Sequence, residues 1–135
     1  MPAQSLTLDM AMAISKAAEA EAAKNGWAVT VVILDHSGLP VSLHRMDDAA
    51  ISSMEIARQK AWSAIGFKRP TKAFEEQLAN GRVAVLRLQG VIPVEGGIPL
   101  ALPDGSIIGA IGVSGVTSVQ DGQVATAGAQ VLLQA

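Results

Sequence analysis

The stretch Val94–Gly115, VEGGIPLALPDGSIIGAIGVSG, decides the fold of this chain. Nearly half of the 13 glycines fall within it, among runs of aliphatic residues. Glycine costs backbone entropy and packs no side chain in a strand, so this density indicates turns, bulges or a backbone that something approaches closely. Pro103-Asp104-Gly105 has the composition of a hairpin turn. We therefore expect strands at 92–102 and 106–114 on either side of it.

A second hairpin is expected earlier in the chain. Residues 27–34, WAVTVVIL, are mostly apolar and rich in valine and isoleucine, which is typical of a central strand buried on both faces. The turn Asp35-His36-Ser37-Gly38 then returns the chain into a partner strand at 40–45. Residues 82–89 have no clear pattern, and extended backbone is one interpretation.

Four helices are predicted around these strands. The first covers 7–24, with Thr7 as its cap, and the second follows an apolar stripe through 49–66. Thr71 can cap a short helix to residue 78, and Ser118 with Asp121 resembles a capping box for a helix over 119–134. The order predicts one domain over 1–135, of mixed α/β (α+β) class, with a mainly antiparallel sheet of about five strands.

Composition narrows the classes of function. Charged residues make up only 16% of the 135 residues and hydrophobic ones 50%, so we expect another subunit to cover part of the surface. The net charge of −2 and the absence of basic blocks exclude a nucleic-acid footprint. No apolar run is long enough for a membrane helix, and no signal peptide is visible, so the cytoplasm is the expected location. Without cysteine there is neither a thiolate metal site nor a thiol nucleophile.

Two groups of residues are candidates for a site. His44 lies near a strand end beside Arg45, while His36 lies in a turn, where a solvated loop residue is the simpler interpretation. Neither histidine belongs to a metal-binding spacing. Arg45 alternates with apolar neighbours, so we expect it to be buried with an anionic partner, in an ion pair or on a ligand.

The second group surrounds the glycines that open the quoted stretch. Glu95 beside Gly96 and Gly97 predicts either the floor of a pocket, with the carboxylate as an acid or base, or a simple bulge. Lys60, next to the apolar stripe of its helix, is a second cation that could hold a carboxylate. The spacing matches neither a dinucleotide loop, a P-loop nor a nucleophile elbow.

Several segments in order, VVILDHSGLPVSLHRMDDA, IARQKAWSAIGFKRPT and GGIPLALPDGSIIGAIGVSG, resemble the GlcG/HbpS family of small haem-binding or haem-degrading-domain proteins. This family also includes the C-terminal domain of PduO-type cobalamin adenosyltransferases. The resemblance covers about residues 6–133. It implies a profilin-like α/β/α sandwich with helices on both faces of the sheet, and homo-oligomers from dimers to octamers. In some members it implies haem binding, and in others an association with small-acid or diol metabolism.

Three functions are consistent with these residues and with the resemblance. In the first, the protein binds haem or a small ligand, with Arg45 and Lys60 neutralising propionates. Some relatives place a histidine in the first helix; this chain has none there, so the remaining candidate iron ligands are His44, His36, Met46 and Thr71. In the second, a cofactor-independent isomerase, lyase or hydratase uses Glu95, or His44, on a carboxylated metabolite. In the third, the chain is an accessory subunit with a vestigial pocket.

Overall fold

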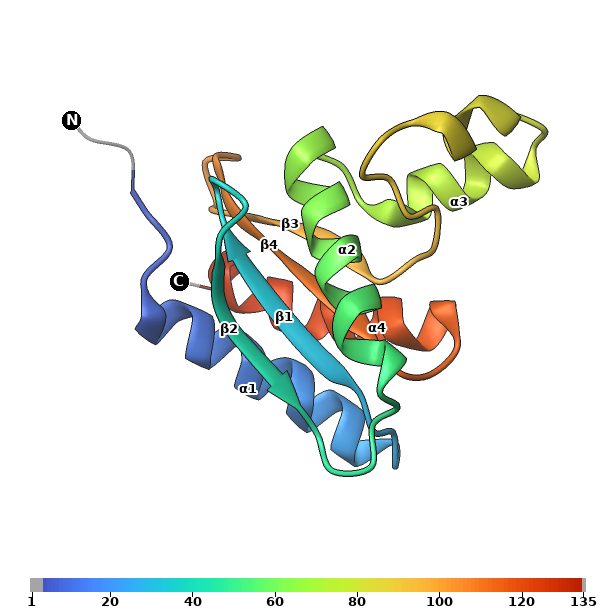
Figure 1. Ribbon diagram of the computed structural model, residues 1–135. Helices are drawn as coiled ribbons and strands as arrows, with labels where there is room; N and C mark the ends of the chain where they lie inside the picture. Colours follow the sequence, from blue (N-terminus) through green and yellow to red (C-terminus); the bar gives the residue numbers. More distant parts are fainter. Residues whose placement is uncertain (1–3, 135) are drawn as a thin grey trace.

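The computed structural model describes residues 4–134 and contains four α-helices and four strands within them (Figure 1). The elements in chain order are α1 (Leu8–Lys24), β1 (Thr30–Asp35), β2 (Pro40–Arg45), α2 (Ser52–Phe67), α3 (Thr71–Ala79), the 3₁₀ helix η1 (Val83–Arg87), β3 (Gly97–Ala101), β4 (Ile107–Ser114), α4 (Ser118–Ala129) and the 3₁₀ helix η2 (Gln130–Leu133). None of the helices in this described range is long and apolar enough to cross a membrane.

The sheet is antiparallel throughout, with strand order β2-β1-β4-β3. Both predicted hairpins are present, and β1 joins them by pairing with β4. The prediction of about five strands was one too many, because residues 82–89 contain η1 rather than a strand. The strand expected from residue 92 begins only at Gly97, because Gly96 has a φ of 134° that breaks the extended run.

Helices cover both faces of the sheet, as Figure 1 shows: α2 lies on one face, and α1 and α4 lie together on the other. β1 is buried on both faces, as its apolar sequence predicts. The larger core lies between the sheet and the α1/α4 pair, and a smaller, alanine-rich core lies under α2. This is the α/β/α sandwich that the sequence led us to expect.

Close approach explains one glycine of the quoted stretch in particular. A Cβ atom at Gly112 would overlap the carbonyl oxygen of Ala57 and lie 2.7 Å from the amide nitrogen of Ala61, both in α2. At Gly112 the close approach that the glycine density indicated is therefore made by α2. Gly109 and Gly115 instead face backbone from Leu34 and from Ala28 and Val29, so β1 and the segment before it are the close neighbours there.

Two helix starts differ from the prediction. α4 is capped by Thr117, whose hydroxyl accepts from the Gln120 amide in a capping box, so the expected Ser118 and Asp121 pair is displaced by one residue. The side chain of Thr71 makes no capping bond to α3, because its hydroxyl bonds the backbone of Gly97 instead. In both places a tertiary contact takes the polar side chain that local spacing assigned to a cap.

Candidate functional site

The side chain of Lys60 is buried between α2 and α4, at the end of the sheet where β3 begins. It is 1% exposed, and its ammonium donates to the Asp121 carboxylate at 2.9 Å and to the Val113 carbonyl at 3.0 Å. The other Asp121 oxygen accepts from the amide of Val116 at 3.1 Å. Burial raises the pKa of Asp121, and the Lys60 ammonium opposes that rise. Lys60 thus joins helices that lie on opposite faces of the sheet.

The glycine floor predicted from sequence makes room for this lysine. A Cβ atom at Gly96 would lie 2.8 Å from the Lys60 Nζ, and one at Gly97 would overlap the Lys60 carbonyl oxygen. The amide of Gly97 donates to the Thr71 hydroxyl at 2.9 Å, and Thr71 is fully buried. The close approach that the glycines indicated is therefore made by the protein's own side chains.

The Glu95 side chain lies against α4, next to Gly122. Its carboxylate packs on Gly122, where a Cβ atom would lie 2.7 Å from the Glu95 Cδ. The two residues, with Glu21, Gln123 and others, line an open groove of about 420 Å³. Desolvation by burial raises the pKa of Glu95, with Lys72 opposing and Glu75 reinforcing the rise. Such a carboxyl can hold a proton more readily than a solvated one.

We expect Glu95→Gln to raise the free energy of unfolding slightly at pH 7 and to leave it unchanged below about pH 4. The folded pKa lies above the unfolded value of 4.5, so ionising this carboxyl costs more in the folded protein. Its contribution is absent in acid, and it lowers stability as the pH rises through the folded pKa. Urea denaturation across this range measures the effect, with the exposed Asp47→Asn as control. A difference that shrinks as the pH rises would contradict the assignment.

His44 belongs to a separate cluster between β2 and α1. Its Nδ1 lies 2.8 Å from the Glu19 carboxylate and 3.2 Å from the Ser15 hydroxyl, which itself donates to Glu19 at 2.5 Å. Sequence reasoning missed Ser15 and Glu19. Their spacing of four residues on a helix, with a fully buried serine on the apolar side, is the signal that could have pointed to them.

The tautomer of His44 follows from these contacts. A carboxylate only accepts hydrogen bonds, so Nδ1 carries the proton that faces Glu19. Nε2 has no hydrogen-bond partner among residues 4–134. The imidazole lines an open groove of about 400 Å³ with Met12, Ala13, Lys16 and Glu19. Two residues along the same face of β2, the buried hydroxyl of Ser42 also lacks a partner within the described chain.

The remaining candidates lie elsewhere. The prediction of a buried Arg45 was wrong: this residue is exposed at an edge strand, and its guanidinium donates to the Ala49 carbonyl at 3.3 Å. His44 and Arg45 are consecutive in β2, so they face opposite sides of the sheet. His36 is exposed in the β1–β2 turn. The structure therefore brings Lys60 against Gly96 and Gly97, whereas the Glu95 side chain lies against α4. His44, Arg45 and His36 lie apart from both.

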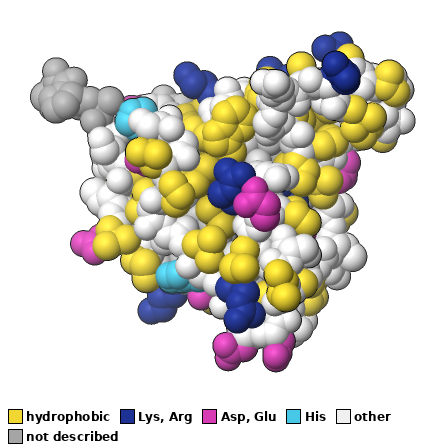
Figure 2. Space-filling model, in the orientation of Figure 1, with side chains coloured by type: hydrophobic (Ala, Val, Ile, Leu, Met, Phe, Trp, Pro, Cys, Tyr) yellow, Lys and Arg dark blue, Asp and Glu magenta, His cyan; other side chains and the backbone are white. Residues whose placement is uncertain are grey.

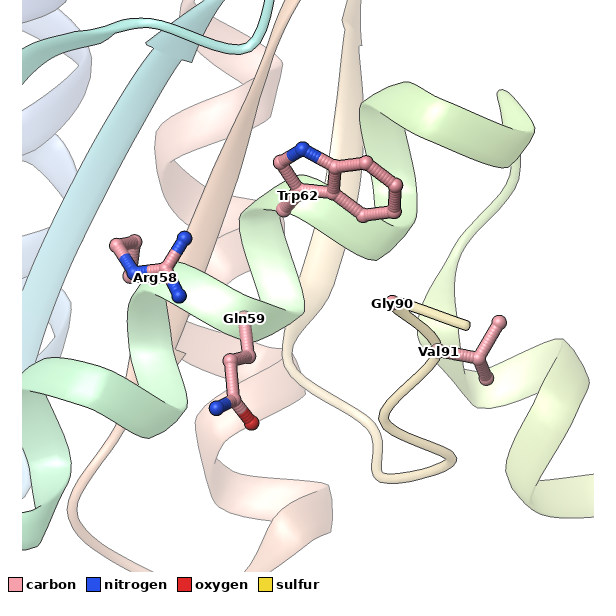
Figure 3. A pocket seen from close by; sticks show the side chains of 5 residues that line it. All are labelled: Arg58, Gln59, Trp62, Gly90 and Val91. Atoms are coloured by element: carbon pink, nitrogen blue, oxygen red, sulfur yellow. The ribbon is translucent and has the colours of Figure 1, made fainter. Parts of the chain in front are cut away.

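A further groove, of about 370 Å³, lies on the outer side of α2 (Figure 3). Arg58, Gln59 and Trp62 project from the helix, and Gly90 and Val91 form the opposite wall in the segment after η1. No sequence pattern pointed to these residues. Within residues 4–134 there is no group of three histidine or acidic side chains arranged to hold a bare metal ion.

Comparison with known proteins agrees with the resemblance in sequence. Residues 6–130 match the family model described as haem degrading protein HbpS-like. Protein GlcG of Escherichia coli (strain K12) is 45% identical over 109 residues, which is 81% of each chain. An uncharacterised 15.0 kDa protein of Citrobacter freundii is 32% identical over 86% of this chain and 84% of its own length.

Solved structures share the fold. A double mutant of Streptomyces reticuli HbpS superposes with a TM-score of 0.87 at 32% identity, covering 98% of this chain and 90% of that one. The PduOC:Heme complex superposes with a TM-score of 0.83 at 28% identity, covering 93% and 94%. The match over residues 6–130, the relation to GlcG and the shared sandwich together show that this chain belongs to the HbpS-like family.

Proposed function

We propose that this protein binds haem or a related tetrapyrrole in the groove between α1 and β2, where His44 would hold the iron. The observation that carries the proposal is the 2.8 Å contact between His44 Nδ1 and Glu19. Histidines that ligate metals commonly donate the other ring N–H to a carboxylate, which sets the tautomer and the ring orientation. Two family members, HbpS and the PduOC:Heme complex, support the choice of ligand class.

The groove has the chemistry that a haem requires. A tetrapyrrole supplies most of the iron ligands itself, so few protein donors are needed, and the free Nε2 of His44 would be sufficient. Met12 and Ala13 offer apolar surface to the ring, and the exposed ammonium of Lys16 can pair with a propionate. The unpartnered hydroxyl of Ser42 is a further polar group on the same face of β2. When bound, haem would supply an iron centre for ligand binding or electron transfer.

In this proposal Lys16 takes the role of propionate partner that the sequence suggested for Arg45 and Lys60. Lys60 is enclosed, and its ammonium already has two acceptors. Arg45 lies on the other face of β2, away from the groove. Thr71 is buried on Gly97, which leaves it no access to a ligand.

Titration of the apo-protein with hemin tests this proposal. We expect a saturable shift of the Soret band, and a loss of affinity of at least tenfold in His44→Ala. His36→Ala is the matched control, since it removes the only other histidine, which is exposed in a turn on a different part of the surface. Glu19→Gln is expected to weaken binding less than His44→Ala, because the ring keeps its donor atom but loses its fixed orientation.

Unchanged hemin affinity in His44→Ala would rule out His44 as the ligand. A wild-type protein that shows no saturable Soret shift would rule out haem binding altogether. That second result would favour the interpretation of the chain as an accessory subunit with a vestigial pocket.

A cofactor-independent isomerase, lyase or hydratase is the second candidate function, and the raised pKa of Glu95 is the observation that favours it. The groove beside Glu95 is acidic, which disfavours binding of an anionic substrate. Its wall also contains Glu21, and no lysine or arginine is among its lining residues within the described chain. Two carboxylates would repel the carboxylated metabolite that this mechanism needs. Haem binding at His44 is therefore the better supported function.

We also infer that the protein is a cytoplasmic homo-oligomer. The support is the low charge content of the chain together with large apolar side chains that remain exposed on the single subunit, among them Leu39, Leu43, Ile51 and Trp62. Covering such side chains with a second subunit removes apolar surface from water, which stabilises the assembly.

A further inference from the structure

The outer side of α2 carries a stripe of four side chains: Ile51, Glu55, Arg58 and Trp62. Ile51 is 87% exposed and Trp62 is 39% exposed. Between them, the guanidinium of Arg58 is paired with the Glu55 carboxylate, with a 3.0 Å bond from Nε. Figure 2 shows this face, where an acidic and a basic side chain lie together over α2 amid hydrophobic side chains.

The four residues are placed symmetrically about the centre of the stripe. At 100° per residue, all four side chains project within an arc of about 60°. Measured from a point midway between Ile56 and Ala57, Glu55 lies as far before the point as Arg58 lies after it. Ile51 and Trp62 are equally far on either side, 11 positions and about 16 Å of helix apart.

The two ends of the stripe are complementary in shape, as its two central residues are in charge. The indole of Trp62 is held at one end by glycines: a Cβ atom at Gly90 would overlap it, and one at Gly66 would lie 3.2 Å from it. Beside this ring lies the groove of about 370 Å³ that also has Gly90 and Val91 in its wall (Figure 3). At the other end of the stripe, Ile51 projects almost fully into solvent. One end of α2 thus presents a hydrophobic protrusion and the other a recess.

We propose that a second copy of this chain docks on α2 by antiparallel pairing of the two α2 helices about a twofold axis. The axis passes between Ile56 and Ala57. Around it, Glu55 of each copy faces Arg58 of the other, and Ile51 of each copy enters the groove beside Trp62 of the other. An isologous interface requires that one patch be complementary to itself, and this stripe meets that requirement in charge and in shape.

Neighbouring apolar surface enlarges the interface. α2 packs over β1, β3 and β4, so the α2 side of β2 stays uncovered, and there Leu43 is 46% exposed. Met54 is 36% exposed on α2 itself, and Leu39 is 62% exposed in the β1–β2 turn. A stable dimer buries about 800 Å² on each partner, which one helix stripe alone does not provide. The proposal specifies the surface of the homo-oligomer inferred above and is independent of haem.

Charge reversal distinguishes this pairing from any other contact. In Glu55→Arg both charges of the stripe are basic, and in Arg58→Glu both are acidic, so each variant opposes its own copy with like charges. By sedimentation velocity we expect each variant alone to dissociate at the α2 contact, with at least tenfold weaker association. An equimolar mixture is expected to recover the wild-type mass, because an all-basic stripe then faces an all-acidic one.

Matched controls come from an exposed ion pair on another helix. Lys72→Glu and Glu76→Lys reverse the charges of the Lys72–Glu76 pair on α3 and are expected to keep the wild-type mass. Ile51→Asp is expected to weaken association without changing the helical circular dichroism. A monomeric wild type, single variants with unchanged association, or a mixture that does not reassociate would each overturn the proposal. Hemin binding is expected to persist in the α2 variants, since His44 lies on the opposite face of the sheet from α2. The two proposals can therefore fail independently of each other.

Discussion

The variant Lys60→Met is expected to lose about 3–5 kcal/mol of unfolding free energy, the cost measured when one partner of a buried ion pair is removed. Methionine keeps much of the apolar stem of lysine but leaves the Asp121 carboxylate, 2% exposed, without its cation. The Val113 carbonyl loses its side-chain donor as well. Because Lys60 connects α2 to α4 past the end of the sheet, the loss affects both layers.

Urea denaturation of the single and double variants measures this effect. The double variant Lys60→Met with Asp121→Asn is expected to recover part of the loss, since no buried charge then remains uncompensated. The exposed pair provides the control: Lys72→Met, which breaks a 4.0 Å contact with Glu76, is expected to change stability by less than about 1 kcal/mol. If Lys60→Met and Lys72→Met lost similar amounts of unfolding free energy, the buried contact of Lys60 would stabilise the fold no more than an exposed ion pair.

The second large effect is expected at Gly112. Gly112→Ala should destabilise the protein by about 3 kcal/mol or prevent folding, because overpacking of a tight contact costs on this order. The added methyl would overlap the Ala57 carbonyl oxygen and lie 2.7 Å from the Ala61 nitrogen, so α2 would have to move away from β4 as a unit. A flexible side chain could turn aside, whereas helix backbone cannot.

Thermal denaturation checks this prediction, with Gly66→Ala as the matched control. Gly66 lies inside α2, and the nearest atom to an added methyl is the Trp62 ring at 3.2 Å. We expect its substitution to be nearly neutral, because alanine favours the helix while the ring shifts slightly. If Gly112→Ala is as stable as Gly66→Ala, the close packing of α2 on β4 does not determine stability.

Local patterns were sufficient for most of the elements. The strand at 40–45, the start of α1 at its Thr7 cap and both hairpin turns were predicted where the structure has them. These features depend on residues close in sequence, such as the side chain of Thr7 accepting from the Met10 amide at 3.1 Å. The failures came where a distant contact intervened. Thr71 and Asp121 were assigned to helix caps, and in the structure they bond Gly97 and Lys60.

The candidate site was predicted less completely. The glycines at 96 and 97 indicated a close approach of some group to the backbone, and in the structure Lys60 lies against both. Spacing could not show that Lys60 is the group that approaches, because the two segments are more than 30 residues apart. Nor could it join His44 to Glu19, which lie 25 residues apart and meet only when β2 packs on α1.

The sequence alone determined the class of the fold and the family, because periodicity, turn residues and the order of matching segments are properties of the chain itself. The tertiary structure alone decided which glycines admit α2, which lysine is enclosed, and which histidine has a carboxylate beside it. Those outcomes depend on the faces of β2 and β4 and on the packing of helices against them. A shift of one residue along a strand moves a side chain to the opposite face of the sheet, so His44 and Arg45, adjacent in sequence, belong to different surfaces.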